Sequence, residues 1–320
     1  MAKKVMSYGL WPSPLTPSSL SGEKRLRDLS WDTDGETLVW LEGRSDLGVL
    51  VCSRADGDAP RDLTTELSVR ARVGYGGGDM AASHGSAYFV SGGRIYRQAL
   101  TSGGAEPITP AFGDMASPQV SPDGRWVLFV HTYEDIDCLA VVDSQGKLWP
   151  QKLVVGDDFY MQPTWHPDGQ RIAWVSWNHP QMPWDGTKLG IARLSLDDAG
   201  MPSLAEQMVV AGDEDTAIFQ PQFSPDGRYL AFVSDANGWD NLYLYDLEKG
   251  DQRALVTGEF ELGLCAWAQG MRTYAWGPDS GRIYYTRNEQ GAASLWSADV
   301  ATGDTAPVAG LSGYTHFSQI

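Results

Sequence analysis

A short turn recurs along the chain with an apolar segment after each copy, and this repeat constrains the fold more than any other feature. Copies reading SPDGRWVLFVHT, HPDGQRIAWVSW and SPDGRYLAFVSD begin at Ser121, His166 and Ser224. More distant copies of the turn occupy Asp32–Gly35, Ala82–Ser86 and Gly277–Gly281. The spacing of roughly 40 to 60 residues is typical of the blades of a β-propeller.

Each repeat contains the parts of a four-stranded sheet. A residue pair ending in proline precedes three of the turns, at Ser117–Pro118, Gln162–Pro163 and Gln220–Pro221, and three apolar segments separated by polar turns follow. Proline presets the first turn residue, glycine supplies the positive φ, and aspartate can bond the backbone of its own turn. The turn aspartates are therefore interpreted as structural and not catalytic. One such sheet cannot bury both of its faces, whereas copies stacked around an axis can.

The repeat predicts an all-β fold, a β-propeller of four-stranded antiparallel blades with TolB-like or WD40-like repeats. Six blades are visible, beginning near Leu29, Met80, Met115, Met161, Ile218 and Leu262. The final residues, GYTHFSQI, resemble the first strand of a seventh. We expect a lead segment over residues 1–28 and one propeller domain over residues 29–320. A ring open by one blade exposes strand edges, so we also expect a homodimer through the open edge, or a six-bladed ring closed by THFSQI.

Composition sets limits on the partners of the chain. Of the 320 residues, 42% are apolar and 20% charged, which allows a packed core, and the net charge is −17. A surface that acidic argues against nucleic acid and anionic lipid as partners. No targeting signal or membrane-spanning run is visible, and Cys52, Cys138 and Cys265 are interpreted as small buried residues in strands. These features favour a cytoplasmic protein.

A search for catalytic motifs in the sequence finds none. The nucleophile elbow G-x-S-x-G of α/β-hydrolases is missing, and so are HExxH, the phosphate-binding P-loop and CxxC. We therefore expect no catalytic residue, no metal and no cofactor. We also expect the chain alone not to hydrolyse acyl-peptide or aminoacyl-anilide substrates.

Four loops differ from the short turns of the repeat, and propeller topology places all of them on one face of the ring. They are His131–Asp137, Gly156–Pro163, Asn178–Leu189 and Gly212–Pro221. Their acidic and aromatic residues are candidates for gating a substrate and for holding its α-ammonium group. These candidates are Glu134, Asp135, Asp157, Asp158, His179, Trp184, Asp185, Asp213, Glu214 and Asp215. The alternatives are a solvated acidic rim and, for Asn178–Leu189, a packing flap between blades.

Several segments outside the turns resemble one enzyme family. YGLWPSPLT, RVGYGGGDM, WNHPQMPWDGTKL, VSDANGWDNLYLYD and WAQGMRTYAW, in this order, are similar to segments of the acylaminoacyl-peptidase-like branch of the prolyl oligopeptidase family of serine peptidases. The resemblance implies a seven-bladed N-terminal propeller that caps a C-terminal α/β-hydrolase domain, normally in cis, and limits access to small peptides. The hydrolase half has no counterpart in this sequence, so no catalytic residue is carried over.

Three functions remain open at this point. The first is the non-catalytic propeller of such an acylaminoacyl-peptidase or dipeptidyl-aminopeptidase-like serine peptidase, which gates and orients oligopeptides. The second is a free-standing TolB-like propeller that binds a protein partner. The third, a propeller enzyme with a metal on its axis, is the weakest, because the inner strands offer only His166 as a ligand.

Overall fold

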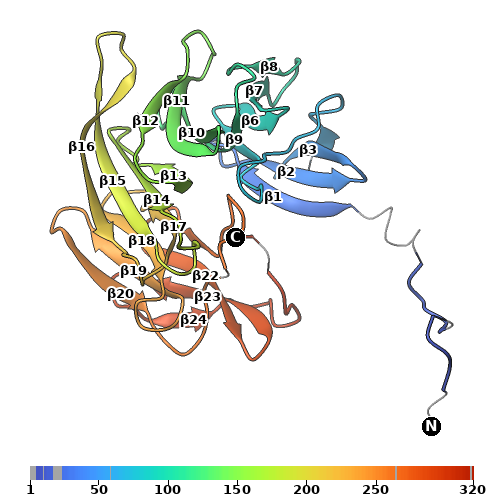
Figure 1. The fold of residues 1–320 in the computed structure, drawn as a ribbon. Coiled ribbons are helices and arrows are strands. Elements are labelled where there is room, and N and C mark those ends of the chain that lie inside the picture. The colour runs from blue at the N-terminus through green and yellow to red at the C-terminus, as the bar shows by residue number, and fades with distance from the viewer. Residues whose placement is uncertain (1–4, 10, 17–23, 58, 264, 318) are drawn as a thin grey trace.

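The chain folds into six four-stranded antiparallel sheets that surround a common centre, as a six-bladed β-propeller (Figure 1). This computed structural model describes residues 5–9, 11–16, 24–57, 59–263, 265–317 and 319–320. The described residues form strands and turns and contain no helix. The prediction of an all-β propeller with six blades is therefore confirmed.

Each blade takes its strands in chain order, so hydrogen-bonded neighbours are also neighbours in sequence. Blades 1 and 2 are β1 (Arg25–Trp31), β2 (Thr37–Arg44), β3 (Leu47–Arg54), β4 (Arg61–Asp62), and β5 (Met80–Ser83), β6 (Ser86–Ser91), β7 (Arg94–Ala99), β8 (Glu106–Pro107). Blades 3 and 4 are β9 (Asp114–Val120), β10 (Trp126–Tyr133), β11 (Ile136–Asp143), β12 (Gln151–Val154), and β13 (Phe159–Trp165), β14 (Arg171–Trp177), β15 (Lys188–Leu196), β16 (Pro202–Ala211). Blades 5 and 6 are β17 (Ile218–Phe223), β18 (Tyr229–Ser234), β19 (Asn241–Asp246), β20 (Asp251–Val256), and β21 (Tyr274–Trp276), β22 (Arg282–Glu289), β23 (Ala292–Asp299), β24 (Thr305–Pro307).

The lead segment ends before Arg25 and not at residue 28, because β1 begins at Arg25. Residues 5–9 and 11–16 lie apart from the ring in Figure 1 and form no strand. Tyr8 and Trp11 are both exposed there, with their rings 6.0 Å apart. The rest of the predicted lead before β1, apart from Lys24, lies outside the described residues.

The recurring turn joins the first two strands of a blade through side-chain hydrogen bonds. In blade 3 the Ser121 hydroxyl donates to Asp123 Oδ1 at 2.6 Å and accepts the backbone N–H of Trp126 at 2.9 Å. Asp123 Oδ1 also accepts the N–H of Arg125, while Gly124 takes φ of +71°. Ser224 and Asp226 repeat these contacts in blade 5. These contacts support the interpretation of the turn aspartates as structural.

The residue before each repeated proline forms a bulge in the innermost strand of its blade. Ser117, Gln162 and Gln220 have φ of 52°, 52° and 51°, and the pairing register shifts at each of them. A bulge re-aims its side chain, and here the side chains reach neighbouring blades. Gln162 Oε1 accepts the N–H of Gln220 at 2.7 Å, and Gln220 Nε2 donates to the Tyr274 carbonyl at 2.7 Å. These amides connect blades 4, 5 and 6 around the axis.

Apolar packing between blades accounts for five of the six neighbouring pairs. One buried cluster joins blades 1 and 2, a second joins blades 2, 3 and 4, and a third joins blades 4, 5 and 6. None of these clusters of described residues contains members of both blade 1 and blade 6. The hydrophobic core is therefore an open arc, and the join between blades 6 and 1, called the seam below, is built differently.

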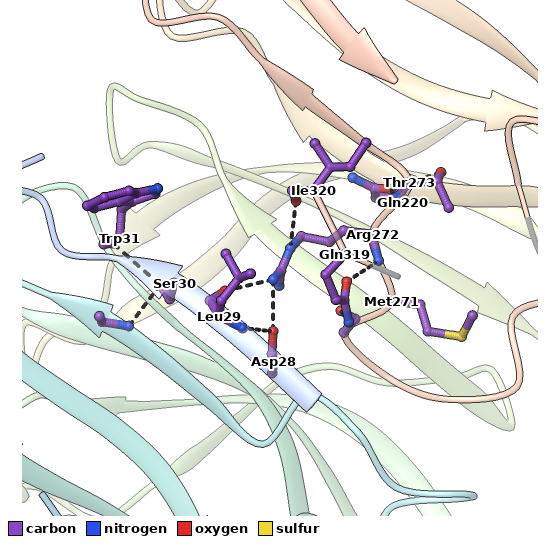
Figure 2. A network of polar contacts seen from close by, with 12 residues as sticks. Asp28, Leu29, Ser30, Trp31, Gln220, Met271, Arg272, Thr273, Gln319 and Ile320 are labelled. Atoms are coloured by element: carbon purple, nitrogen blue, oxygen red, sulfur yellow. Dashed lines mark hydrogen bonds and ion pairs between the residues drawn. The ribbon is translucent and has the colours of Figure 1, made fainter. Parts of the chain in front are cut away.

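A single arginine dominates the seam (Figure 2). Arg272, just before β21, donates from Nη2 to Asp28 Oδ1 at 2.8 Å and to the Leu29 carbonyl at 2.7 Å, both in β1. Its Nε donates to the Ile320 carbonyl at 3.2 Å, and its backbone N–H donates to Gln319 Oε1. Polar contacts therefore join blade 6 to blade 1 and to the C-terminal residues.

The C-terminal residues do not form the seventh-blade strand or the closing strand that we expected. Residues 308–317, 319 and 320 contain no strand, and Ser318 lies outside the described residues. Among the described residues, two backbone bonds attach this segment to blade 6, from Val308 N–H to the Leu295 carbonyl and from Ala293 N–H to the Thr315 carbonyl. A strand requires a partner ladder of several bonds, whereas here the segment reaches Arg272 through Gln319 and Ile320.

The cysteines differ from one another in burial. Cys52 and Cys138 are buried in β3 and β11, as predicted, and burial raises the pKa of the Cys138 thiol to about 11. Cys265 is exposed and belongs to no strand, so its assignment as a buried strand residue is wrong. It lies in the connection between blades 5 and 6, which crosses the centre of the ring.

No helix in the described part of the chain is long and apolar enough to span a membrane.

Candidate functional site

The connection between blades 5 and 6 crosses the centre of the ring and contacts the opposite blades. Gln269 N–H donates to the Gly76 carbonyl at 2.9 Å, and its Nε2 donates to the Tyr160 carbonyl at 2.8 Å. Its Oε1 accepts the Ser117 hydroxyl at 3.0 Å. The buried Gln269 thus binds blades 3 and 4 through its side chain and the connection that enters blade 2 through its backbone. It fixes the floor of the face on which the connections between blades lie.

The glycine-rich sequence GYGGGD packs against this connection. A Cβ on Gly77 would lie 2.3 Å from the Gln269 carbonyl oxygen, and a Cβ on Gly78 would lie 2.4 Å from Ser117 Oγ. Both residues also have positive φ. Glycine is therefore required by the close approach of two backbones, which is a structural reason for this motif.

Aromatic rings from three connections meet above that floor. The Trp267 ring lies 4.4 Å from the Trp184 ring and 5.4 Å, edge to face, from the Tyr75 ring. Tyr75 precedes blade 2, Trp184 lies in the loop between β14 and β15, and Trp267 precedes blade 6. Each such aromatic pair contributes about 0.5–1.5 kcal/mol to stability. They span the mouth of the ring from loops that are far apart in sequence.

Below these rings is a cavity of about 420 Å³, a volume within the range of ligand pockets. Phe159 and Trp177, stacked at 5.3 Å between ring centroids, form another part of its wall. Other lining residues are Val73, Gly74, Tyr75, Thr132, Asp135, Asp137, Tyr160, Met161, His179, Pro180, Gln181, Met182, Pro183, Trp184, Ala266, Trp267 and Gln269. The cavity is therefore an apolar, aromatic pocket with carboxylates on one side.

The two carboxylates come from the hairpin of blade 3. The expected long loop His131–Asp137 is mostly strand: β10 reaches Tyr133, β11 begins at Ile136, and only Glu134 and Asp135 form the turn. Both turn residues have positive φ, at 53° and 61°, which is typical of a tight hairpin. Asp135 and Asp137 line the cavity, whereas Glu134 does not.

Asp137 is the buried member of this pair, with 9% of its surface exposed. Burial raises the pKa of its carboxyl group, and the nearby Asp135 raises it further. Hydrogen bonds from the Thr132 side chain and the Tyr160 backbone lower it in part, as does the charge of His131. A cation entering the cavity would favour the ionised form of Asp137.

Asp157 and Asp158 connect the two loops that border the cavity. Asp157 accepts hydrogen bonds from Ser176 Oγ at 2.7 Å and Asn178 Nδ2 at 2.9 Å, and it pairs with Lys188 Nζ at 3.3 Å. Burial alone would raise the pKa of Asp157, but these hydrogen bonds and the Lys188 charge bring it below its ordinary value. Asp158 Oδ2 accepts the His179 N–H at 2.9 Å. Both carboxylates position the loop that carries His179 and Trp184.

Besides Glu134, four acidic candidates neither line the cavity nor support its wall. Asp185 accepts the N–H of Met182 at 2.9 Å, within its own loop. Asp213 accepts the N–H of Asp215 at 2.9 Å, and hydrogen bonds from Asp215 and Thr216 lower the pKa of Asp213. Glu214 and Asp215 are exposed. Of the ten candidates, Asp135, His179 and Trp184 line the cavity, and Asp157 and Asp158 support its wall.

Sequence reasoning missed most of the aromatic wall. Tyr75, Phe159 and Trp267 line the cavity but were not among the candidates. Tyr75 and Trp267 belong to the segments GYGGG and WAQGM, which were singled out only for a family resemblance. The sequence signal that could have indicated them is the unusual combination of an aromatic residue with nearby glycines in both segments.

The arrangement suits binding of an organic amine. An aromatic, largely apolar cavity accepts an apolar side chain, while Asp135 and Asp137 can accept hydrogen bonds from an ammonium group. In the described part of the chain, no group of three His, Cys, Asp or Glu residues is placed to hold a metal ion.

Comparison with known proteins agrees with this architecture. Residues 139–318 match the family model described as TolB beta propeller domain. A puromycin-hydrolyzing peptidase of Mycobacterium tuberculosis superposes with a TM-score of 0.84 at 26% identity, over 99% of this chain and 51% of that one. A puromycin hydrolase superposes with a TM-score of 0.82 at 29% identity, over 96% of this chain and 50% of that one. Dipeptidyl-peptidase 5 of Porphyromonas gingivalis is 28% identical over 163 residues, 48% of this chain and 22% of that protein.

Proposed function

Because this chain belongs to the TolB β-propeller domain family and spans about half the length of the peptidases it resembles, we propose that it is the non-catalytic propeller of a peptidase. In this proposal the propeller gates and orients short peptides for an α/β-hydrolase domain of the prolyl oligopeptidase type. The observation that carries the proposal is the aromatic cavity at the mouth of the ring, with Asp135 and Asp137 on its wall.

The position of the cavity supports a gating role. It opens on the face that carries the connections between blades, and β1 also starts at this face, because first strands begin where the connections end. Tyr8 and Trp11 of the lead segment are exposed and provide apolar contacts for a neighbouring domain.

The proposed substrate is a short peptide with a free amino terminus. Its first side chain would occupy the space between Trp177, Trp184 and Trp267, and its ammonium group would bind Asp135 and Asp137. A charge-assisted hydrogen bond of this kind contributes about 1.5–3 kcal/mol, which corresponds to roughly tenfold or more in affinity. The central Gln269 blocks a straight path along the axis, so the peptide would be held at the mouth.

Fluorescence titration tests the proposal, because Trp184 and Trp267 line the cavity. We expect phenylalanyl-glycine amide to change the tryptophan emission and to bind about tenfold more tightly than its N-acetylated form. The double variant Asp135→Asn with Asp137→Asn should lose this preference. Asp213→Asn with Asp215→Asn, on the same face but outside the cavity, is the matched control and should keep it.

Two results would argue against the proposal. Equal binding of the free and acetylated peptides would show that Asp135 and Asp137 do not recognise the amino terminus. If neither peptide binds, the cavity is not a peptide-binding site. Hydrolysis of aminoacyl anilides by the purified chain, surviving a serine-directed inhibitor, would contradict the non-catalytic role.

A further inference from the structure

A second cavity, of about 410 Å³, lies beside the aromatic one and has the opposite charge. The two cavities share Gly74, Tyr75 and Gln269 as lining residues, so a single molecule can extend from one into the other. Arg27, Arg70 and Arg72 line the second cavity. In a chain with 24 basic and 41 acidic side chains, three arginines at one cavity are an unusual concentration.

Local structure brings these three arginines to one place. Arg27 is the residue skipped in the pairing of β1 with β2, where Leu26 pairs with Glu42 and Asp28 pairs with Leu41. A bulge of this kind re-aims a side chain and is frequent next to functional sites. Arg70 and Arg72 flank the buried Ala71 in the connection to blade 2, so both are exposed while the segment between them is fixed.

The acidic groups at this cavity are already engaged. Asp28 is paired with Arg272, which lies outside the cavity lining. Asp79 is buried and accepts the backbone N–H of Ala71 at 2.7 Å. Within the described part of the chain, the side chains of Arg27, Arg70 and Arg72 take part in no ion pair and donate no hydrogen bond; Arg70 donates only its backbone N–H, to the Val90 carbonyl at 2.8 Å. Three guanidinium groups thus remain available to an anion.

We propose that Arg27, Arg70 and Arg72 form a binding site for the C-terminal carboxylate of the short peptide whose amino-terminal residue occupies the aromatic cavity. Guanidinium groups bind carboxylates through paired hydrogen bonds and are the preferred side chains for this task. The face then has an acidic end at Asp135 and Asp137, a basic end at the three arginines, and Tyr75 between them. This polarity selects peptides by both termini and favours short peptides over internal segments of longer chains.

The inference rests on the proposed function, and the experiment separates the two. Tryptophan fluorescence is used to measure binding of phenylalanyl-glycyl-glycine and of its C-terminal amide to the full chain. We expect the free acid to bind about tenfold more tightly than the amide. The double variant Arg70→Gln with Arg72→Gln should reduce this ratio to about one, while Arg125→Gln, in a turn on the opposite face, should leave it unchanged.

Each other result overturns a defined part of the argument. If acid and amide bind equally well, the carboxylate site is wrong and the peptide-binding cavity stands. If the preference for the acid persists in the double variant, these arginines do not provide it. If neither peptide binds, the proposed function fails, and this inference fails with it. Inorganic phosphate that binds as tightly as the peptide acid would indicate a site for free anions instead.

Discussion

Blade 6 uses two residues of one short segment to contact its two neighbours, and the two contacts differ in kind. Tyr274 faces blade 5, where its buried hydroxyl lies 2.5 Å from the Gln220 carbonyl and 2.8 Å from the Ala231 carbonyl and shares its one proton between them. Arg272 faces blade 1, where it contacts Asp28 and Leu29. The first interface is part of a continuous apolar cluster, whereas no cluster of described residues joins blade 6 to blade 1. Apolar packing therefore holds one side of blade 6, and a polar contact holds the other.

A carboxyl group with a raised pKa lies at each of these two interfaces, buried in Asp28 and half-buried in Asp240, and its surroundings differ. At the seam, burial raises the pKa of Asp28 even though the charge and hydrogen bond of Arg272 lower it. Between blades 5 and 6, burial raises the pKa of Asp240 to about 6, and the neighbouring Glu261 and Asp235 add to the effect. Asp28 thus has a cation to stabilise its ionised form, and Asp240 has only further acids.

The largest expected effect is the loss of the apolar interface. Tyr274→Ala removes a fully buried ring and leaves two carbonyls without their donor, so we expect the free energy of unfolding to fall by about 3–5 kcal/mol. Chemical denaturation measures this change. Tyr284→Ala, at a half-buried position of the next strand, is the control and should cost less than half as much. Equal losses would show that the interface of blades 5 and 6 is no stronger than its surroundings.

Removing the seam contact should cost less and act locally. Arg272→Ala leaves Asp28 buried without its cation, a change that costs about 3–5 kcal/mol at a closed site. Because the seam can open and admit water, we expect a loss of about 2 kcal/mol. Amide hydrogen exchange should accelerate in β1 and at the C-terminal residues before it does so in β17–β20.

Two further variants test this interpretation of the seam. Arg272→Ala combined with Asp28→Asn should recover part of the stability, because no buried charge then remains. Arg282→Ala, at an exposed arginine of blade 6, should change little. Accelerated exchange distributed evenly over all blades would mean that the seam is not an independent weak point.

Asp240 predicts a stabilising substitution and a dependence on pH. Because its pKa of about 6 in the folded state lies above the ordinary value of 3.8, the folded protein holds this proton more tightly than the unfolded chain. This contribution to stability is complete below pH 3.8 and is lost as the pH rises through about 6. At pH 7, Asp240→Asn should therefore stabilise the chain by about 1–2 kcal/mol, less than the full shift implies because the group is partly exposed.

Thermal denaturation across pH 4 to 8 checks this prediction. The difference in melting temperature between Asp240→Asn and the unchanged chain should grow with pH and level off above about 7. Asp213→Asn, whose pKa is lowered, is the control and should not show this growth. A constant difference at every pH would exclude titration of Asp240 as the cause.

The repeat was sufficient to predict the blades but not their closure. The Ser–Pro–Asp–Gly turns and alternating apolar segments are local patterns, and they gave the six sheets in the correct order. The final GYTHFSQI matched a strand pattern too, yet its described residues form no ladder. Local propensity cannot show whether a partner strand lies alongside, which is decided by tertiary contacts.

The candidate site was predictable only in part for a similar reason. Loop topology correctly placed Asp135, His179 and Trp184 on one face, because the connections of every blade emerge at the same end. The same face carries Asp213, Glu214 and Asp215, but they lie away from the cavity. In their loop the Asp213 side chain accepts the N–H of Asp215 and so stabilises a local turn. The crossing of the ring by Trp267 and Gln269 depends on contacts between residues more than 100 positions apart, such as Gln269 with Tyr160. No sequence pattern indicates such contacts.

The smallest expected effect distinguishes the contribution of the side chain from that of the backbone conformation at the Gln162 bulge, on the well-packed side of the ring. Gln162 has φ of 52°, accepts the N–H of Gln220 and donates to the Met271 carbonyl. Gln162→Ala and Gln162→Gly both remove these hydrogen bonds, but only glycine adopts the positive φ without strain. We expect alanine to destabilise the chain by about 1 kcal/mol more than glycine, measured by chemical denaturation. Gln222, in β17, has no positive φ and provides the control. At that position we expect glycine to be more destabilising than alanine. Equal stability of the alanine and glycine variants would mean that the bulge relaxes when the Gln162 side chain is removed. In that case the hydrogen bonds of the Gln162 amide, and not Pro163, would hold the inner strand in its bulged form.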